Sequence, residues 1–184
     1  MTAIHAPQLF LNKYLQEKIG EQFDMTIPFL PTMPSDIDAL TSSYPQSNGM
    51  LAVYDRMFKM RRGPFPHIKC EQVLYYFYAS EDIAPLYRTQ QLTQDLLDRG
   101  DESAQELNSW ISGIWKTAGS PTDPVSGKDA YNLGTGLNPD WFLLPYFHEI
   151  KIFQLEETRD IIDFGTARTW GGNKIIIDYE WHAS

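Results

Sequence analysis

The sequence contains one cysteine, Cys70, and only 15 basic residues against 24 acidic residues in a chain of 184. A single cysteine cannot form an internal disulfide, and the four histidines do not combine with it in a zinc-binding spacing. The net charge of −9 disfavours binding to free DNA, because such binding depends on basic side chains that neutralise phosphates. We therefore expect a protein that folds in a reducing compartment and whose ligand is not free DNA.

The sequence also has no apolar run of the length that a membrane span requires, and its first ten residues lack the basic and apolar regions of a secretory signal. These absences predict a soluble protein made in the cytoplasm. The contents of 42% hydrophobic and 21% charged residues are typical of a globular chain, and a chain of this length can build one core without disulfides or metal. We expect a single domain over residues 1–184.

Three segments have the apolar spacing of helices that pack on a sheet. Residues 7–24 carry an apolar side chain at every fourth position and open with a proline, which suits a first helical turn. A second helix is predicted over residues 80–99, with Ser80 as its N-cap and Gly100 as its left-handed C-terminal cap. A third begins at Asp101 and has a core-facing stripe that ends at Trp115.

Four segments show the alternation typical of strands. Residues 50–58 and 67–79 are predicted to be antiparallel neighbours joined by residues 59–66. Residues 147–157, with an irregularity, and residues 174–182 alternate between one buried and one wet face.

Long irregular segments separate these elements. Residues 26–48 contain four prolines and are predicted to be an extended connector. Residues 116–140 are rich in glycine and proline and are predicted to be a long structureless loop, and residues 158–172 an arm or long hairpin. The whole pattern predicts an α+β fold in one domain, with a mainly antiparallel sheet packed by helices and with long loops or arms.

A search for catalytic motifs finds no convergent set. The sequence has no Gly-x-Ser-x-Gly elbow, and Cys70 lies in a predicted strand, where a free cysteine is typically a buried apolar side chain. His148 and Glu149 are not followed by a second histidine at helical spacing, and neighbouring strand residues point to opposite faces. The stretch Gly134–Gly136 lacks the lysine of a phosphate loop. The sequence therefore predicts no catalytic, cofactor-binding or metal-binding residue.

Surface for binding is the more prominent feature. Aromatic residues make up 14% of the chain and include an unbroken run at Tyr75–Tyr78, which predicts a strand with both faces covered, one by a second subunit. A compact basic tip, Lys59, Arg61 and Arg62, precedes this strand and is either a plain polar hairpin tip or an electrostatic docking point for an acidic partner. The predicted partner-interface residues are Tyr76, Phe77, Arg61, Arg62, Phe164 and Trp170.

The order of elements resembles the tail terminator, or tail-completion, proteins of tailed bacteriophages. The segments that carry the resemblance are the helix at 11–23, the strands at 50–58 and 67–79, the helical segment 80–115 and the end strand 174–182. The resemblance implies a non-enzymatic virion protein that forms a ring, a homohexamer, at the head-proximal end of the tail. Such a ring ends tube growth and joins the tail to the head connector.

The resemblance also implies the partners of that ring. They are the tail tube protein, the neck or connector proteins and a sheath where the tail has one. DNA passes through the lumen without specific binding, because an acidic field repels it, and neither a membrane nor a cofactor takes part.

Other functions remain open on the sequence alone. A related possibility is a different tail or connector component, such as a head-closure or baseplate subunit. A second is a small hydrolase or nucleotide-modifying enzyme whose site is built from the long loop, with His148, Asp140 and Asp129. A third is a monomeric binding module that uses exposed aromatic side chains.

Overall fold

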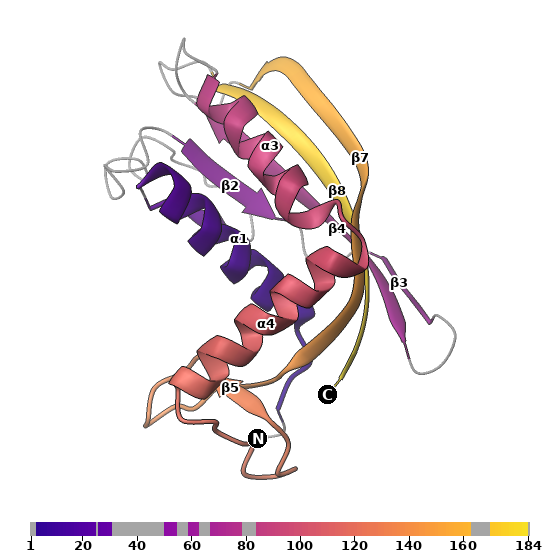
Figure 1. The fold of residues 1–184 in the computed structure, drawn as a ribbon. Helices are drawn as coiled ribbons and strands as arrows, with labels where there is room; N and C mark the ends of the chain where they lie inside the picture. The colour runs from indigo at the N-terminus through magenta and orange to yellow at the C-terminus, as the bar shows by residue number, and fades with distance from the viewer. Residues whose placement is uncertain are drawn as a thin grey trace.

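The structure is a computed structural model that describes residues 3–24, 26–30, 50–54, 59–62, 67–78, 84–162 and 170–183. It has the predicted α+β fold, in which helices pack on a mainly antiparallel sheet (Figure 1). The described strands of this sheet follow the order β1, β2, β4, β8, β7, and β3 also pairs with β4. Their bounds are β1 Phe29–Leu30, β2 Met50–Tyr54, β3 Lys59–Arg62, β4 Ile68–Tyr78, β7 Pro145–Ile162 and β8 Trp170–Ala183.

Strands β4 and β8 form the centre of the sheet. They pair antiparallel from Ile68 opposite Trp181 to Tyr78 opposite Gly171. Every second side chain of these strands faces the helices. The helices cover this face of β8, which confirms the buried face predicted for that strand. The buried residues of that face are Ile175, Ile177, Tyr179 and Trp181.

Three described helices cover one face of this sheet, namely α1 (Pro7–Phe23), α3 (Ala84–Leu97) and α4 (Asp101–Thr117) (Figure 1). Helix α1 begins with its proline, as predicted, and its buried side chains include Leu11, Leu15 and Ile19. It ends at Phe23, and its C-cap Asp24 adopts a left-handed conformation with a φ of 49°. The apolar spacing that predicted these helices reflects their contact with the sheet.

The junction between α3 and α4 docks on β7. Helix α3 ends at Leu97, before the predicted cap, and Gly100, with a φ of 61°, instead precedes the first turn of α4. Gly100 forms a β-bridge with Ile150, whose N–H donates to the glycine carbonyl at 3.1 Å. The Asp98 carboxylate accepts from the N–H of Ile152 at 3.0 Å. This junction therefore fixes the register of the helices against the edge of the sheet.

Strand β7 contains irregularities that change which side chains share a face. Its register with β8 shifts between Phe147 and Glu149, so that His148 is an inserted residue. Phe147 and Ile150 are both buried on the helix side, although they are three residues apart. His148 and Glu149 consequently lie together on the opposite face. The predicted irregularity of this strand is confirmed.

The prediction of a structureless segment over residues 116–140 is wrong. Strand β5 (Ala130–Asn132) pairs with β6 (Trp141–Leu143) in a second small sheet. The side chain of Asn132 holds the turn between them, because its Oδ1 accepts from Gly134 and Asp140, each at 2.9 Å. Gly134 has no room for a side chain, since a Cβ there would lie 2.1 Å from the carbonyl oxygen of Asn138. This loop is ordered by side-chain hydrogen bonds, which the amino-acid composition does not reveal.

The other irregular segments are described in part. Residues 158–162 and 170–172 continue β7 and β8 as a long hairpin, which is one of the two forms predicted for the arm. Residues 163–169 lie outside the described residues. Residues 31–48 of the predicted connector also lie outside them. Residues 59–62, predicted to be a basic tip, form β3 with Lys59 opposite Glu71. This pairing extends the sheet at the end of β4.

Candidate functional site

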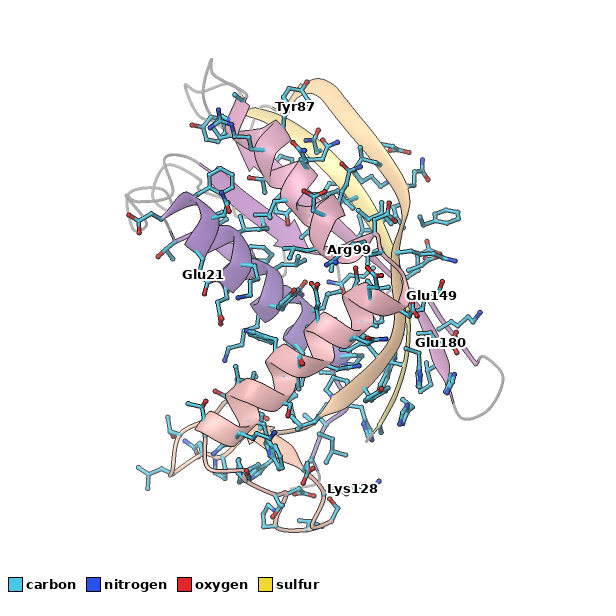
Figure 2. All side chains as sticks on the ribbon, viewed as in Figure 1. Glu21, Tyr87, Arg99, Lys128, Glu149 and Glu180 are labelled. Atoms are coloured by element: carbon cyan, nitrogen blue, oxygen red, sulfur yellow. The ribbon has the colours of Figure 1, made fainter. Side chains whose placement is uncertain are left out.

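We define the outer face as the surface of β4, β8 and β7 on the side away from the helices. Figure 2 shows Glu149 and Glu180 on this side. Side chains of both charge signs surround a shallow depression of about 290 Å³ on it, and the exposed ring of Phe153 lies at its edge. The charged residues that line the depression are Lys69, Glu71, Glu149, Lys151, Asp178 and Glu180.

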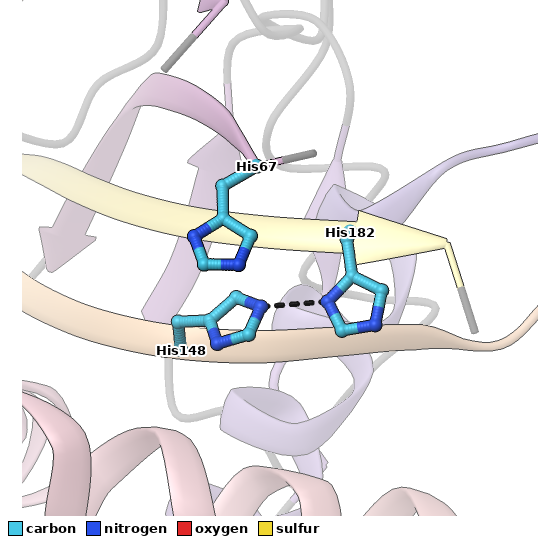
Figure 3. A group of neighbouring side chains, drawn as sticks. All are labelled: His67, His148 and His182. Carbon is cyan, nitrogen blue, oxygen red and sulfur yellow. Dashed lines mark hydrogen bonds between the residues drawn. The ribbon is translucent and has the colours of Figure 1, made fainter. Parts of the chain in front are cut away.

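Three histidines gather beside this depression, one from β7, one from β8 and one from the residue before β4 (Figure 3). His67 directly precedes β4, His182 lies near the end of β8, and His148 is the inserted residue of β7. The pairing of Ile68 with Trp181 places His67 beside His182 on the outer face. One ring nitrogen from each histidine lies within 4.8 Å of those of the other two. We refer to these three residues as the histidine cluster.

The contacts of the histidine cluster are close. His148 Nε2 and His182 Nδ1 are 2.6 Å apart, a hydrogen bond in which one neutral ring donates to the other. The rings of His67 and His148 stack with their centroids 3.7 Å apart. The carboxylate of Glu180 lies 2.5 Å from His67 Nδ1 and also 3.6 Å from Lys69 Nζ. The ring centroids of Tyr146 and His148 are 5.2 Å apart, in an edge-to-face arrangement.

Burial and neighbouring histidines set the charge of the cluster. Burial lowers the pKa of His148, and the nearby rings of His67 and His182 lower it further, against the opposite effect of Glu180. Burial, then His67, lowers the pKa of His182 as well. Both rings are therefore neutral near pH 7 and keep a lone pair. Such nitrogens accept a proton or coordinate a divalent transition metal.

Two of the predicted interface residues belong to the core instead. Tyr76 is 0% exposed, and its hydroxyl lies 2.9 Å from Thr93 Oγ1 on α3. Phe77 is 1% exposed. Burial raises the pKa of the Tyr76 hydroxyl, so this phenol stays neutral. The prediction that these two side chains contact a partner does not fit their positions, because the subunit itself already covers them.

The structure describes no side-chain contact for the other four predicted interface residues, Arg61, Arg62, Phe164 and Trp170. Arg61 and Arg62 are placed on β3, and Trp170 on β8 opposite Ile162, but their side chains lie outside the description. Phe164 lies outside the described residues altogether.

The residues of the hydrolase alternative do not form one cluster. His148 belongs to the histidine cluster, whereas Asp129 and Asp140 are exposed residues that flank the small sheet. Cys70, expected to be a buried apolar side chain, is 4% exposed and accepts a hydrogen bond from Trp181 Nε1 at 3.1 Å. Burial raises the pKa of its thiol to about 11, so it is not a nucleophile.

Sequence reasoning missed the histidine cluster for two reasons. The cluster residues are 34 to 115 positions apart in the chain, so no local motif joins them. Strict alternation also places His148 and Glu149 on opposite faces, whereas the inserted residue in β7 brings both to the outer face. The available signal was positional, because His67 and His182 stand at the ends of two segments predicted to be strands.

Neither a scan against protein-family models nor a comparison with curated proteins gives a match for this chain. Among the described helices, none has the length and apolar character needed to cross a bilayer.

Proposed function

We propose that this chain is a structural virion protein of a tailed bacteriophage, a tail terminator or neck subunit that assembles as a ring, a homohexamer. In this role the ring lies at the head-proximal end of the tail, ends tube growth and joins the tail to the head connector. The order of the described elements, from the first helix to the end strand β8, supports the proposal because it matches the order on which the resemblance rests.

The observation that carries the proposal is the part of the outer face around the depression, which none of the described helices covers. The described helices all pack on one face, whereas the outer face presents charges of both signs and Phe153, which is 62% exposed (Figures 1 and 2). Aromatic side chains are enriched at protein–protein interfaces, so Phe153 marks the part of the outer face best suited to a partner. A second copy offers complementary charges, because the same face carries Lys69 and Lys151 as well as carboxylates.

The edge of β7 supports the same conclusion. In the described sheet β7 is the last strand, and the junction between α3 and α4 occupies its edge at Ile150 and Ile152. Past that point, the described part of the chain places no strand beside it. An edge of this kind accepts a strand or loop of a neighbouring subunit through backbone hydrogen bonds.

The net charge suits a ring through which DNA passes. Each subunit contributes −9, so a closed ring has a strongly acidic field. An acidic lumen repels DNA and releases no counterions, which lets the genome pass without binding. No catalytic step belongs to this role.

The first prediction concerns Phe153. Light scattering over a wide concentration range, with negative-stain images of the same fractions, is expected to show closed rings of the native chain that also cap purified tail tubes. Phe153→Asp removes apolar burial from the contact, so the concentration at which half of the chain is assembled should rise by about tenfold or more. The melting temperature of the dilute, unassembled subunit should stay unchanged, because the Phe153 side chain is exposed there.

The matched control is Val125→Asp, at a residue that is 64% exposed and lies in the loop before the small sheet. This variant should assemble as the native chain does. A protein that stays monomeric at every concentration and fails to cap tail tubes would overturn the proposal, as would equal effects of the two variants on assembly.

A further inference from the structure

We propose that the histidine cluster, His67, His148 and His182, binds a divalent first-row transition metal ion, and we use Zn²⁺ as the test ion. This inference is independent of the proposed ring, because it depends only on contacts within one chain. It rests on the convergence of three imidazole nitrogens from three neighbouring strands.

The distances fit a metal site after small side-chain rotations. Nitrogens bound to a tetrahedral zinc ion at 2.0–2.1 Å are about 3.3 Å apart. The contact of 2.6 Å between His148 and His182 must open by about 0.7 Å, and the widest separation of 4.8 Å must close by about 1.5 Å. All three side chains are partly exposed, so such rotations displace no buried neighbour.

Glu180 supplies the support that metal-bound histidines usually have. Its carboxylate lies 2.5 Å from Nδ1 of His67, so the proton of that ring is held on Nδ1 and Nε2 keeps its lone pair. Lys69 Nζ lies 3.6 Å from the other oxygen of the carboxylate. A carboxylate–histidine pair of this kind fixes the tautomer and orients the ring toward an ion.

The donor set defines the class of ion. Three imidazoles favour Zn²⁺, Co²⁺, Ni²⁺ or Cu²⁺ over Mg²⁺ or Ca²⁺, which prefer oxygen ligands. His67 is 30% exposed in its side chain, so the cluster is open to solvent. A fourth coordination position is therefore available to water or to a donor from outside the chain.

The test uses the full chain without an affinity tag, stripped of metal by a chelator and kept dilute. Calorimetry with Zn²⁺ should show one ion bound per chain, and Mg²⁺ should show none. Zinc at about 100 times its dissociation constant should raise the melting temperature by about 5–10 °C. Co²⁺ should give the visible absorption bands of a tetrahedral site.

The variants identify the ligands. His148→Ala and His182→Asn should each weaken zinc binding by more than about 100-fold. Glu180→Gln should weaken it by about 10- to 100-fold, because this change removes only a partner that orients His67. His5→Ala is the matched control, since His5 is the remaining histidine and does not belong to the cluster. It should bind zinc as the native chain does.

Each outcome decides the proposal. It is overturned if the native chain binds no stoichiometric zinc, because the cluster is then only a hydrogen-bonded group of neutral rings. It is also overturned if the His148 and His182 variants bind as tightly as the native chain, or if His5→Ala weakens binding equally. The metal-free melting temperature of each variant separates loss of a ligand from loss of the fold. None of these results depends on ring assembly.

Discussion

At the scale of single residues, the buried amide of Gln72 has partners on a neighbouring helix and a neighbouring strand. Gln72 is buried and donates to Asn12 Oδ1 on α1 at 2.8 Å, while Tyr179 lies 3.4 Å from the other side of the same amide. Such bonds stabilise buried amides that otherwise lose their hydration. The same requirement explains why the hydroxyl of Tyr76 lies beside Thr93.

A second prediction concerns the thiol of Cys70. Because burial raises its pKa to about 11, the native protein should not react with a thiol reagent at pH 8 over the time in which a free thiol reacts fully. Spectrophotometry of the released chromophore checks this. The same protein in denaturing urea should release one equivalent per chain. Rapid labelling of the native protein would show that the strand pair opens at this point.

The histidine cluster shows the limit of sequence reasoning at this scale. The apolar alternation of β8 is visible in the sequence because one face packs on helices, but nothing in the chain around His148 marks it as an inserted residue. The insertion lies two residues before Ile150, where the junction at Gly100 docks, and this tertiary contact is not visible in the sequence. The fold was therefore predictable to the level of its elements, and the candidate site was not.

At the scale of elements, the sequence predicted those whose burial follows a regular period. Helix α1 and strand β8 are such elements. The small sheet was missed because its strands have three residues each and depend on the side chain of Asn132. The loop before it depends similarly on Asp123, whose buried carboxylate accepts from the N–H groups of Val125 and Ser126.

A third prediction concerns this loop and pH. Hydrogen bonds, first that of the Ser126 hydroxyl, lower the pKa of Asp123 in the folded chain below its value in the unfolded chain. The resulting stability is present above the unfolded pKa, near 4, and is lost as the pH falls through the folded pKa. Urea unfolding from pH 7 to pH 3 should therefore show a smaller loss of stability for Asp123→Asn than for the native chain.

The exposed neighbour Asp129 provides the comparison. Asp129→Asn should follow the native pH dependence. If both substitutions change the pH dependence equally, the effect belongs to the net charge of the loop and not to the hydrogen bonds of Asp123.

At the scale of the whole molecule, stability should be distributed unevenly. Strands β4 and β8 are paired on both sides and covered by the helices, whereas β5 and β6 form a small two-stranded sheet to which the described chain adds only a bridge from Ile4 to Phe142. Local opening is easiest where few apolar contacts are lost. The two ends of the molecule therefore differ in how they respond to partial unfolding.

Hydrogen exchange tests this difference. Amides of residues 175–179 should exchange only through global unfolding, and those of residues 130–132 should exchange earlier and independently of denaturant at low concentrations. Equal protection of the two segments would show that the small sheet and the main sheet unfold as one cooperative unit. The ring-forming and zinc-binding proposals do not affect this expectation, because it concerns the isolated chain.

The inserted residue in β7 has a consequence for how this strand tolerates changes in length. A strand preserves its two faces only if the number of residues between any two inward side chains keeps its parity. Deleting His148 restores regular alternation from Phe147 to Ile152 and leaves Phe147 and Ile150 in the core, with the loss of one imidazole. Deleting Lys151 instead turns Ile152 from the helix side to the outer face. His148 is thus a position where one codon can be lost while the hydrophobic core keeps its composition.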